Sequence, residues 1–186
     1  MKDQKGNLYI VATPIGNLQD ITYRAVETLK NVDFIVCEDT RVTSKLLNHY
    51  EIKKPMIALN EFNEDQILYE VIKRLETESC ALVSDAGTPL ISDPGYRLVK
   101  EAKRKMFVVS PIPGASAVIA ALSASGLPTD KFTFLGFLPK SKVRAGKLLS
   151  KFKVLEQTVI LFESPHRIVA TLELIHNLFG DIEITV

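Results

Sequence analysis

The 186-residue chain has room for one large domain or two small ones, and its 46% hydrophobic and 24% charged residues are ordinary for a water-soluble globular protein. A formal net charge of +1 argues against a protein that binds polyanions over its whole surface, although it leaves local basic patches open. No apolar run is long enough to span a bilayer, and the N-terminus lacks a signal-peptide core, so we expect a cytoplasmic protein without membrane contact. Cys37 and Cys80 match neither a metal-binding spacing nor a disulfide framework, so we expect two buried thiols and no metal.

Strand and helix patterns alternate along the first two thirds of the chain. In chain order they are a strand at 8–12, a helix at 20–30, a strand at 34–37, a helix at 40–50, a strand at 56–59, a helix at 64–76, a strand at 80–83, a helix from 96 and a strand at 107–109. Asp20 is the expected N-cap of the first helix. This regular alternation predicts an α/β fold whose five strands form a largely parallel sheet with helices on both faces.

The last third departs from this pattern. A helix rich in Ala and Ser at 115–124 precedes the break Ser125-Gly126-Leu127-Pro128-Thr129, where we place a boundary between an N-terminal α/β domain (1–125) and a C-terminal one (126–186). The second domain shows strands at 132–137 and 158–162, a helix at about 166–178 and a further strand pattern at 182–186. Because the chain stops inside that last pattern, we expect a partial second domain.

The segment from Ser84 to Gly95 is the most informative loop. It connects a buried strand to a helix and contains two Gly, two Pro and two Asp residues, more than the shortest connection needs. In an open α/β sheet such loops border the ligand crevice beyond the carboxyl ends of the strands. The alternative is a plain turn, since Gly, Pro and Asp are also common turn residues.

Four other connections between a strand and a helix have the same character, at residues 13–17, 38–41, 111–116 and 163–167. Because each follows a strand, all belong at the carboxyl edge of a sheet, where helix N-termini offer unpaired N–H groups. The loops contain neither G-x-G-x-x-G nor a P-loop, and Ser84 and Ser164 lie outside a nucleophile-elbow context. The five loops together predict a binding cleft rather than a hydrolytic or P-loop site.

A basic segment runs from Lys140 to Lys153 without a single acidic residue. Leu148, Leu149 and Phe152 could form the buried stripe of a short helix and leave the cations outward. Two interpretations remain open: a solvated helix face, or a surface that holds a phosphate backbone.

The loops carry a specific resemblance. The motifs are VATPIGNL (11–18), CEDTR (37–41), SDAGTPLISDPG (84–95), IPG (112–114), ALSASGLP (121–128), GFLP (136–139) and FESPHR (162–167). In this order and spacing they resemble the small-subunit ribosomal RNA methyltransferases of the tetrapyrrole methylase superfamily. The resemblance implies S-adenosylmethionine-dependent methylation of a cytidine ribose 2′-hydroxyl in 16S rRNA. It also implies two α/β/α domains with the methyl donor between them, a homodimer, and relatives that continue well past the position of Val186.

The resemblance also implies a donor site. The residues it assigns to S-adenosylmethionine are Ile15, Asp85, Gly87, Thr88, Ile91, Ala115, Ser116 and Phe162. Thr88 and Ser116 could hydrogen-bond the methionine end of the donor. Ile15, Ile91 and Phe162 would pack on it, with core packing as the alternative for these three.

Methylation of a hydroxyl also needs a proton acceptor and contacts to the RNA. Glu163 and His166 are the candidate acceptors, with Asp39 as the runner-up. The candidate RNA contacts are Arg41, Lys140, Lys142, Arg144, Lys147 and Arg167, and the expected partner is 16S rRNA or the small ribosomal subunit. Structural roles are the alternatives for Glu163, as a helix cap, and for Arg41, as a partner of Asp39.

Two other functions stay open on the sequence. One is a methyltransferase of the same fold that acts on a tetrapyrrole, another small molecule or a protein side chain. The other is a non-enzymatic RNA- or nucleotide-binding fragment.

Overall fold

The computed structural model describes residues 5–60 and 63–186. The chain divides into two compact units, Met1–Ala117 and Val118–Val186. This division falls at the start of helix α5 (Ala117–Ala124), whereas the sequence places the domain boundary just after the end of that helix. The boundary after residue 125 therefore stays a prediction.

The first unit is built on a five-stranded parallel sheet. Its strands are β1 (Asn7–Val11), β2 (Phe34–Cys37), β3 (Met56–Ala58), β4 (Cys80–Val83) and β5 (Val108–Ile112), in the order β3-β2-β4-β1-β5. In the middle of the sheet Leu8 pairs with Cys80 on one side and Val109 on the other. The parallel sheet predicted from the alternating pattern is confirmed.

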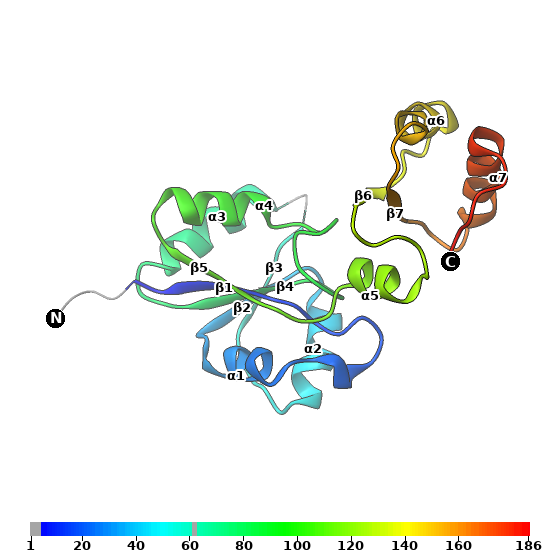
Figure 1. Cartoon of the computed structure of the whole chain (residues 1–186). Coiled ribbons are helices and arrows are strands. Elements are labelled where there is room, and N and C mark those ends of the chain that lie inside the picture. Colours follow the sequence, from blue (N-terminus) through cyan, green and yellow to red (C-terminus); the bar gives the residue numbers. More distant parts are fainter. Residues whose placement is uncertain (1–4, 61–62) are drawn as a thin grey trace. The chain divides into compact units, whose positions relative to one another are not determined.

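Helices cover both faces of this sheet (Figure 1). Side chains of α3 (Glu64–Arg74) and α4 (Tyr96–Arg104) pack with Phe34 in one core, whereas side chains of α1 (Tyr23–Asn31) and α2 (Thr40–His49) pack with Ile35 in the other. Phe34 and Ile35 are neighbours in sequence and both fully buried, because successive strand residues point to opposite faces of a sheet. The short apolar runs are therefore buried on both sides, as parallel strands usually are.

Cys37 and Cys80 are buried, unpaired thiols in this sheet. Burial raises the pKa of the Cys80 thiol to about 12. The sequence prediction of two buried thiols is confirmed.

The start of α1 differs from the prediction. Asp20 lies inside a short 3-10 helix, η1 (Leu18–Asp20), and the N-cap of α1 is Thr22. The Thr22 hydroxyl accepts a hydrogen bond from Ala25 N at 3.1 Å, which satisfies one of the free N–H groups of the first helical turn. Asp20 as the cap was wrong because the 3-10 turn delays the helix by two residues.

The second unit contains two parallel strands, β6 (Phe132–Phe137) and β7 (Thr158–Phe162). They accompany α6 (Lys142–Leu149), η2 (Ser150–Phe152) and α7 (Ile168–Phe179). Leu138, Ala145 and Leu149 form the buried centre of this unit, with leucines of α7 packed against it. No helix in the described part of either unit is long and apolar enough to cross a membrane.

Residues 182–186 do not form the predicted strand. Apolar and polar residues alternate there, but a strand also needs a neighbouring strand to receive its backbone hydrogen bonds. In the structure the Thr185 hydroxyl instead donates to the Ser125 carbonyl at 3.0 Å. The side-chain pattern alone was an insufficient basis for this prediction.

Candidate functional site

The sheet of the first unit has its topological switch point at β4. The helix after β4 covers the face occupied by α3 and α4, whereas the helices after its neighbours β1 and β2 cover the opposite face. The connecting loops therefore diverge at the carboxyl ends of these strands, which is where open α/β sheets bind ligands. The segments that meet there are the β1–α1 connection and the loop at 84–95.

These two loops are joined by backbone hydrogen bonds. Thr13 N donates to Gly87 O at 2.9 Å and Gly87 N donates to Thr13 O at 3.0 Å. The Thr13 hydroxyl, 2% exposed, donates to Ser84 O at 3.1 Å. These three hydrogen bonds connect the two loops directly.

Gly87 lies close to both the β1–α1 connection and the segment that precedes α5. Its φ of +83° is in the left-handed region, and a Cβ on this residue would come within 3.3 Å of Ile15 Cγ2 and 3.9 Å of Ala115 O. The next residue, Thr88, donates its hydroxyl hydrogen to Ala115 O at 3.1 Å. Four of the residues expected at the donor site, Ile15, Gly87, Thr88 and Ala115, are thus brought together, and we call them the switch-point cradle.

The other expected donor-site residues have different surroundings. Ser116 follows Ala115 and is partly buried, and Ile91 is 43% exposed between Leu90 and Ser92, two non-glycine residues with φ near +75° and +73°. Such left-handed residues are strained and cluster at functional sites. Phe162 belongs to the second unit, where its ring packs edge-on against Phe134 with centroids 4.8 Å apart.

Asp85 points toward α2 rather than into the cradle. Its carboxylate accepts a hydrogen bond from Asp39 N at 3.1 Å. Burial raises the pKa of Asp85, and burial with the charge of Asp85 raises the pKa of both Glu38 and Asp93. Glu38, Asp85 and Asp93 form an acidic group with raised pKa values beside the switch point, which is a common property of functional sites.

The pKa of Asp39 is lowered, in contrast to these three carboxylates. Arg41 contacts its carboxylate through Nε at 3.0 Å and a terminal nitrogen at 2.6 Å, and Arg41 N donates to it at 2.8 Å as the N-cap bond of α2. These hydrogen bonds hold the pKa of Asp39 at about 2. Asp39 is therefore a weak base, and Arg41 is engaged with it although the Arg41 side chain is 87% exposed.

Glu163 and Arg167 organise the connection between β7 and α7. The Glu163 side chain is 2% exposed and accepts from Ser164 N at 2.8 Å and from the Thr171 hydroxyl at 2.8 Å. Arg167 pairs with it at 3.2 Å and also donates to Leu138 O at 3.1 Å. His166, between them in sequence, is exposed.

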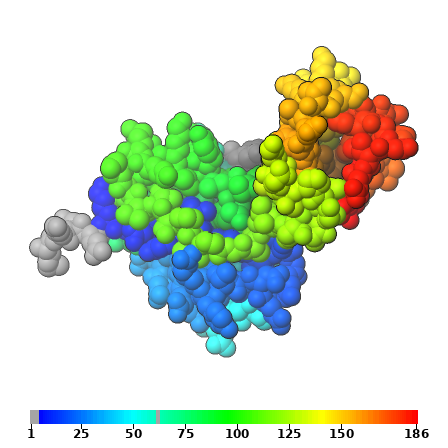
Figure 2. Space-filling model, viewed as in Figure 1, coloured from blue at the N-terminus to red at the C-terminus, as the bar shows by residue number. Residues whose placement is uncertain are grey.

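The basic segment forms α6 and η2 and lies at the surface of the second unit (yellow in Figure 2). Leu149 is buried and Leu148 packs beside it, as the predicted stripe requires. The cations of the segment, Lys140, Lys142, Arg144, Lys147, Lys151 and Lys153, are all exposed. This arrangement is compatible with both interpretations of the segment.

Sequence reasoning missed three contributors to these sites. Thr13 and Ser84 support the cradle through their hydroxyls, and Thr171 supports Glu163 from the second turn of α7. The signal for Thr13 was its place directly after a strand, before Pro14. Thr171 gives no such signal, since its partner is eight residues away.

The comparisons with known proteins agree with this architecture. The family model described as Tetrapyrrole (Corrin/Porphyrin) Methylases matches residues 7–186. The chain belongs to the tetrapyrrole methylase family. The membership predicted from the loop motifs is thereby confirmed.

Curated relatives of this tetrapyrrole methylase are about half identical to it. Proteins named ribosomal RNA small subunit methyltransferase I from Halalkalibacterium halodurans and Haemophilus influenzae are 51% and 52% identical over 92% and 97% of the chain. The chain spans 60% and 64% of the length of these two relatives. It spans 81% of the Thermotoga maritima protein of the same name, at 49% identity over 96% of the chain.

Solved structures of other proteins share the fold at low sequence identity. A diphthine synthase aligns with a TM-score of 0.70 at 19% identity, covering 87% of this chain and 65% of its own. Uroporphyrin III C-methyltransferase from Thermus thermophilus aligns with a TM-score of 0.64 at 18% identity, covering 95% of this chain and 78% of its own. These likenesses support the fold.

Proposed function

We propose that this chain belongs to an S-adenosylmethionine-dependent methyltransferase acting on small-subunit ribosomal RNA, at the ribose 2′-hydroxyl of a cytidine in 16S rRNA. The observation that carries the proposal is the switch-point cradle, where Ile15, Gly87, Thr88 and Ala115 meet at the carboxyl edge of the sheet. Relatives about 50% identical over more than nine tenths of the chain are named ribosomal RNA small subunit methyltransferase I. The cradle is the evidence for the proposed methyl donor, and the names of the relatives are the evidence for the proposed RNA substrate.

The residues of the cradle fit the donor. Bound S-adenosylmethionine supplies an electrophilic methyl group on a sulfonium sulfur. Gly87 adopts a φ of +83° and has no Cβ, which lets its backbone pack closely against Ile15 and Ala115. The lone pairs of the Thr88 hydroxyl and the hydroxyl of Ser116 are the polar groups proposed to hold the methionine end, while Ile15 and Ile91 offer apolar surface.

Methyl transfer is an in-line displacement, so alignment of donor and acceptor supplies much of the rate. The acceptor hydroxyl must also lose a proton as the new bond forms. The Glu163 carboxylate is buried, accepts two hydrogen bonds and forms an ion pair with Arg167, so its oxygens are already engaged. Hydrogen bonds from Arg41 keep the Asp39 carboxylate ionised and make it a weak base. Among the three candidate acceptors these contacts favour His166, whose side chain is exposed and adjacent to the buried pair.

The test is transfer of labelled methyl from S-adenosylmethionine to small ribosomal subunits that lack the modification, followed by alkaline hydrolysis of the RNA. A 2′-O-methylated ribose cannot attack its own phosphate, so we expect label in an alkali-resistant dinucleotide. The full-length relative from Haemophilus influenzae, assayed on the same subunits, controls for substrate quality.

Two results would contradict the proposal. Label released entirely as mononucleotides would mean methylation of a base and would overturn the ribose assignment. Measured donor binding with methyl transfer to a tetrapyrrole, another small molecule or a protein side chain, and none to the RNA, would favour a different acceptor on the same fold.

A further inference from the structure

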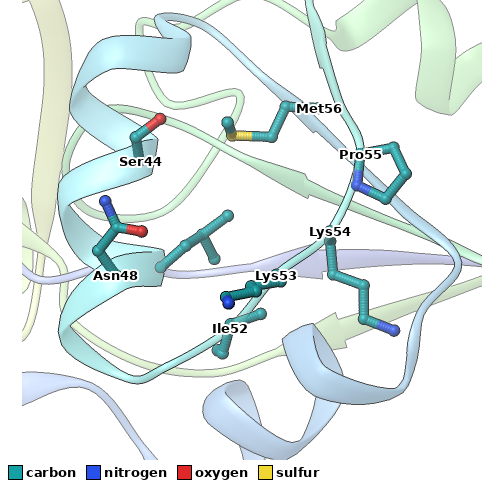
Figure 3. A pocket seen from close by; sticks show the side chains of 8 residues that line it. Ser44, Asn48, Ile52, Lys53, Lys54, Pro55 and Met56 are labelled. Carbon is teal, nitrogen blue, oxygen red and sulfur yellow. The ribbon is translucent and has the colours of Figure 1, made fainter.

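A cavity of the first unit lies away from the switch-point cradle. It is about 390 Å³ in volume and is formed between the later turns of α2 and residues 52–56, which lead into the edge strand β3 (Figure 3). Because β3 begins at Met56, this pocket borders the amino end of the strand, whereas the loops of the cradle follow carboxyl ends. Its volume is within the range of sites for small ligands, about 300–1,000 Å³.

The lining combines an apolar part with free polar groups. Leu47 and Ile52 are 3% and 4% exposed and supply the most buried apolar part of the lining, which Pro55 and Met56 extend. Asn48 lies on α2 one turn after Ser44, so both side chains are on the same face of the helix and border the pocket (Figure 3).

The charged groups of the pocket are not neutralised. Among the described residues neither Lys53 nor Lys54 has a carboxylate within 4.0 Å, and the Asn48 carboxamide makes no hydrogen bond. In Figure 3 the Lys53 amine lies on the side of α2, and the Lys54 side chain extends away from that helix. The site therefore offers cations and an amide to a ligand, beside a surface on which a flat apolar ring can lie.

Another cavity of the same unit differs from this pocket in the charges that line it. A pocket of about 380 Å³ between α3 and α4 also contains lysines, Lys73 and Lys105, but it includes the carboxylates of Glu76 and Glu101. Glu101 pairs with Arg104 and Glu76 with Lys5. The carboxylates of the pocket between α3 and α4 repel an anionic ligand, whereas no acidic residue lines the pocket beside α2.

We propose that the α2 pocket binds an unpaired nucleotide of the RNA substrate, away from the methylation site. The base lies against Pro55 and Met56, the Asn48 carboxamide hydrogen-bonds its edge, and Lys53 with Lys54 contacts the flanking phosphates. A thioether sulfur contacts aromatic rings favourably, and side-chain carboxamides hydrogen-bond the edges of bases. This inference rests on the proposed function only in taking RNA as the substrate.

The test measures binding of a fluorescein-labelled ten-nucleotide single-stranded RNA by anisotropy at several salt concentrations. Lys53→Ala/Lys54→Ala should weaken binding and reduce the slope of log affinity against log salt by about 0.7 for each phosphate that is no longer bound. Asn48→Ala should weaken binding about fivefold or more without changing that slope, because it removes a base contact. Lys73→Ala/Lys105→Ala is the matched control for removal of two surface lysines and should leave affinity nearly unchanged.

The position of the RNA is checked with the same oligonucleotide carrying 4-thiouridine, which should cross-link to a peptide containing residues 52–56. The inference would be overturned if both pocket variants bound the RNA with unchanged affinity and unchanged salt dependence. It would also be overturned if the control variant Lys73→Ala/Lys105→Ala lost as much RNA affinity as Lys53→Ala/Lys54→Ala. Equal competition by polyglutamate would assign the pocket to an acidic protein partner and would also overturn it.

The binding and methyl-transfer assays separate the two proposals. If methyl is transferred to the small subunit and the pocket variants bind RNA normally, the pocket inference fails and the proposed function stands. If no methyl is transferred but the pocket variants lose RNA affinity as described, the proposed function fails and the pocket inference stands.

Discussion

Gly87 is the residue at which a small change should affect donor binding most directly. A side chain there must adopt φ near +83° and occupy the space against Ile15. We expect Gly87→Leu to abolish binding of S-adenosylmethionine in calorimetry. The left-handed backbone should cost about 1–2 kcal/mol of unfolding free energy, and displacement of Ile15 by the new side chain adds to that cost.

The matched control is Gly126→Leu, at φ +77°, where a Cβ would meet no atom within 4 Å. It carries a similar backbone penalty and should bind the donor normally. Donor binding retained by Gly87→Leu would contradict the assignment of the cradle.

Asp39 has a pH dependence of known sign. Its pKa is about 2 in the folded protein, below the ordinary value of 3.8, so its stabilising contribution is complete above the ordinary pKa and is lost as the pH falls toward 2. Asp39→Asn retains a good N-cap for α2 but cannot pair with Arg41 as an anion.

We therefore expect the urea midpoint of the unaltered chain to fall more steeply between pH 4 and pH 2 than that of Asp39→Asn, in parallel unfolding curves. Arg41→Ala should resemble the variant in this range. Identical acid profiles for all three proteins would show that the Asp39–Arg41 contacts do not persist in solution.

At the scale of elements, Glu163 connects β7, α7 and the segment after β6. Its buried carboxylate is the common partner of Ser164, Arg167 and Thr171. Glu163→Ala should lower the unfolding free energy by about 2–4 kcal/mol in urea denaturation, because it leaves their donors unpaired in a largely buried place.

Asp181→Ala is the control in the same unit, since Asp181 is fully exposed where it meets His176, and it should change stability by less than about 0.5 kcal/mol. A Glu163→Ala protein of normal stability that transfers no methyl would instead identify Glu163 as the proton acceptor.

Helix α6 is the element on which the two interpretations of the basic segment differ. Replacing Lys142, Arg144 and Lys147 together by Ala removes three exposed cations and leaves the buried Ala145 and Leu149 in place. If the helix holds phosphates, RNA affinity should fall and its salt dependence should flatten, by about 0.7 in slope for each phosphate of a single strand that is no longer bound. Unchanged RNA affinity at low salt would establish that α6 is only a solvated surface.

At the scale of the whole molecule, the two units have separate cores of unequal size. The first unit buries side chains on both faces of its sheet, whereas the core cluster of the second unit is built on three buried side chains. Local opening is easier where few apolar contacts are broken. We expect amides of β6 and β7 to exchange with deuterium faster than those of β1 and β4 in mass-spectrometric measurements, and equal rates in both sheets would indicate a single cooperative unit.

Much of the first unit could be predicted because its elements depend on local periodicity. Ile67, Leu68, Val71, Ile72 and Leu75 recur at helical spacing, and all five pack in the core beneath α3. Residues 182–186 show the limit of the same method, because their alternation is of strand type and yet no strand forms. Periodicity reports which side chains can share a face, but it does not supply the partner strand.

The sequence by itself determined the class of fold, the carboxyl-edge loops and the family, because strand and helix periods and the loop motifs are properties of contiguous residues. Only the tertiary structure decided what each polar side chain does. It joined Thr13 to Gly87 across 74 residues, paired Arg41 with Asp39, and buried Glu163 beside Thr171. Hydrogen bonding and burial depend on atoms that the chain brings together from distant positions, and these decide whether a carboxylate is a free base or a structural partner.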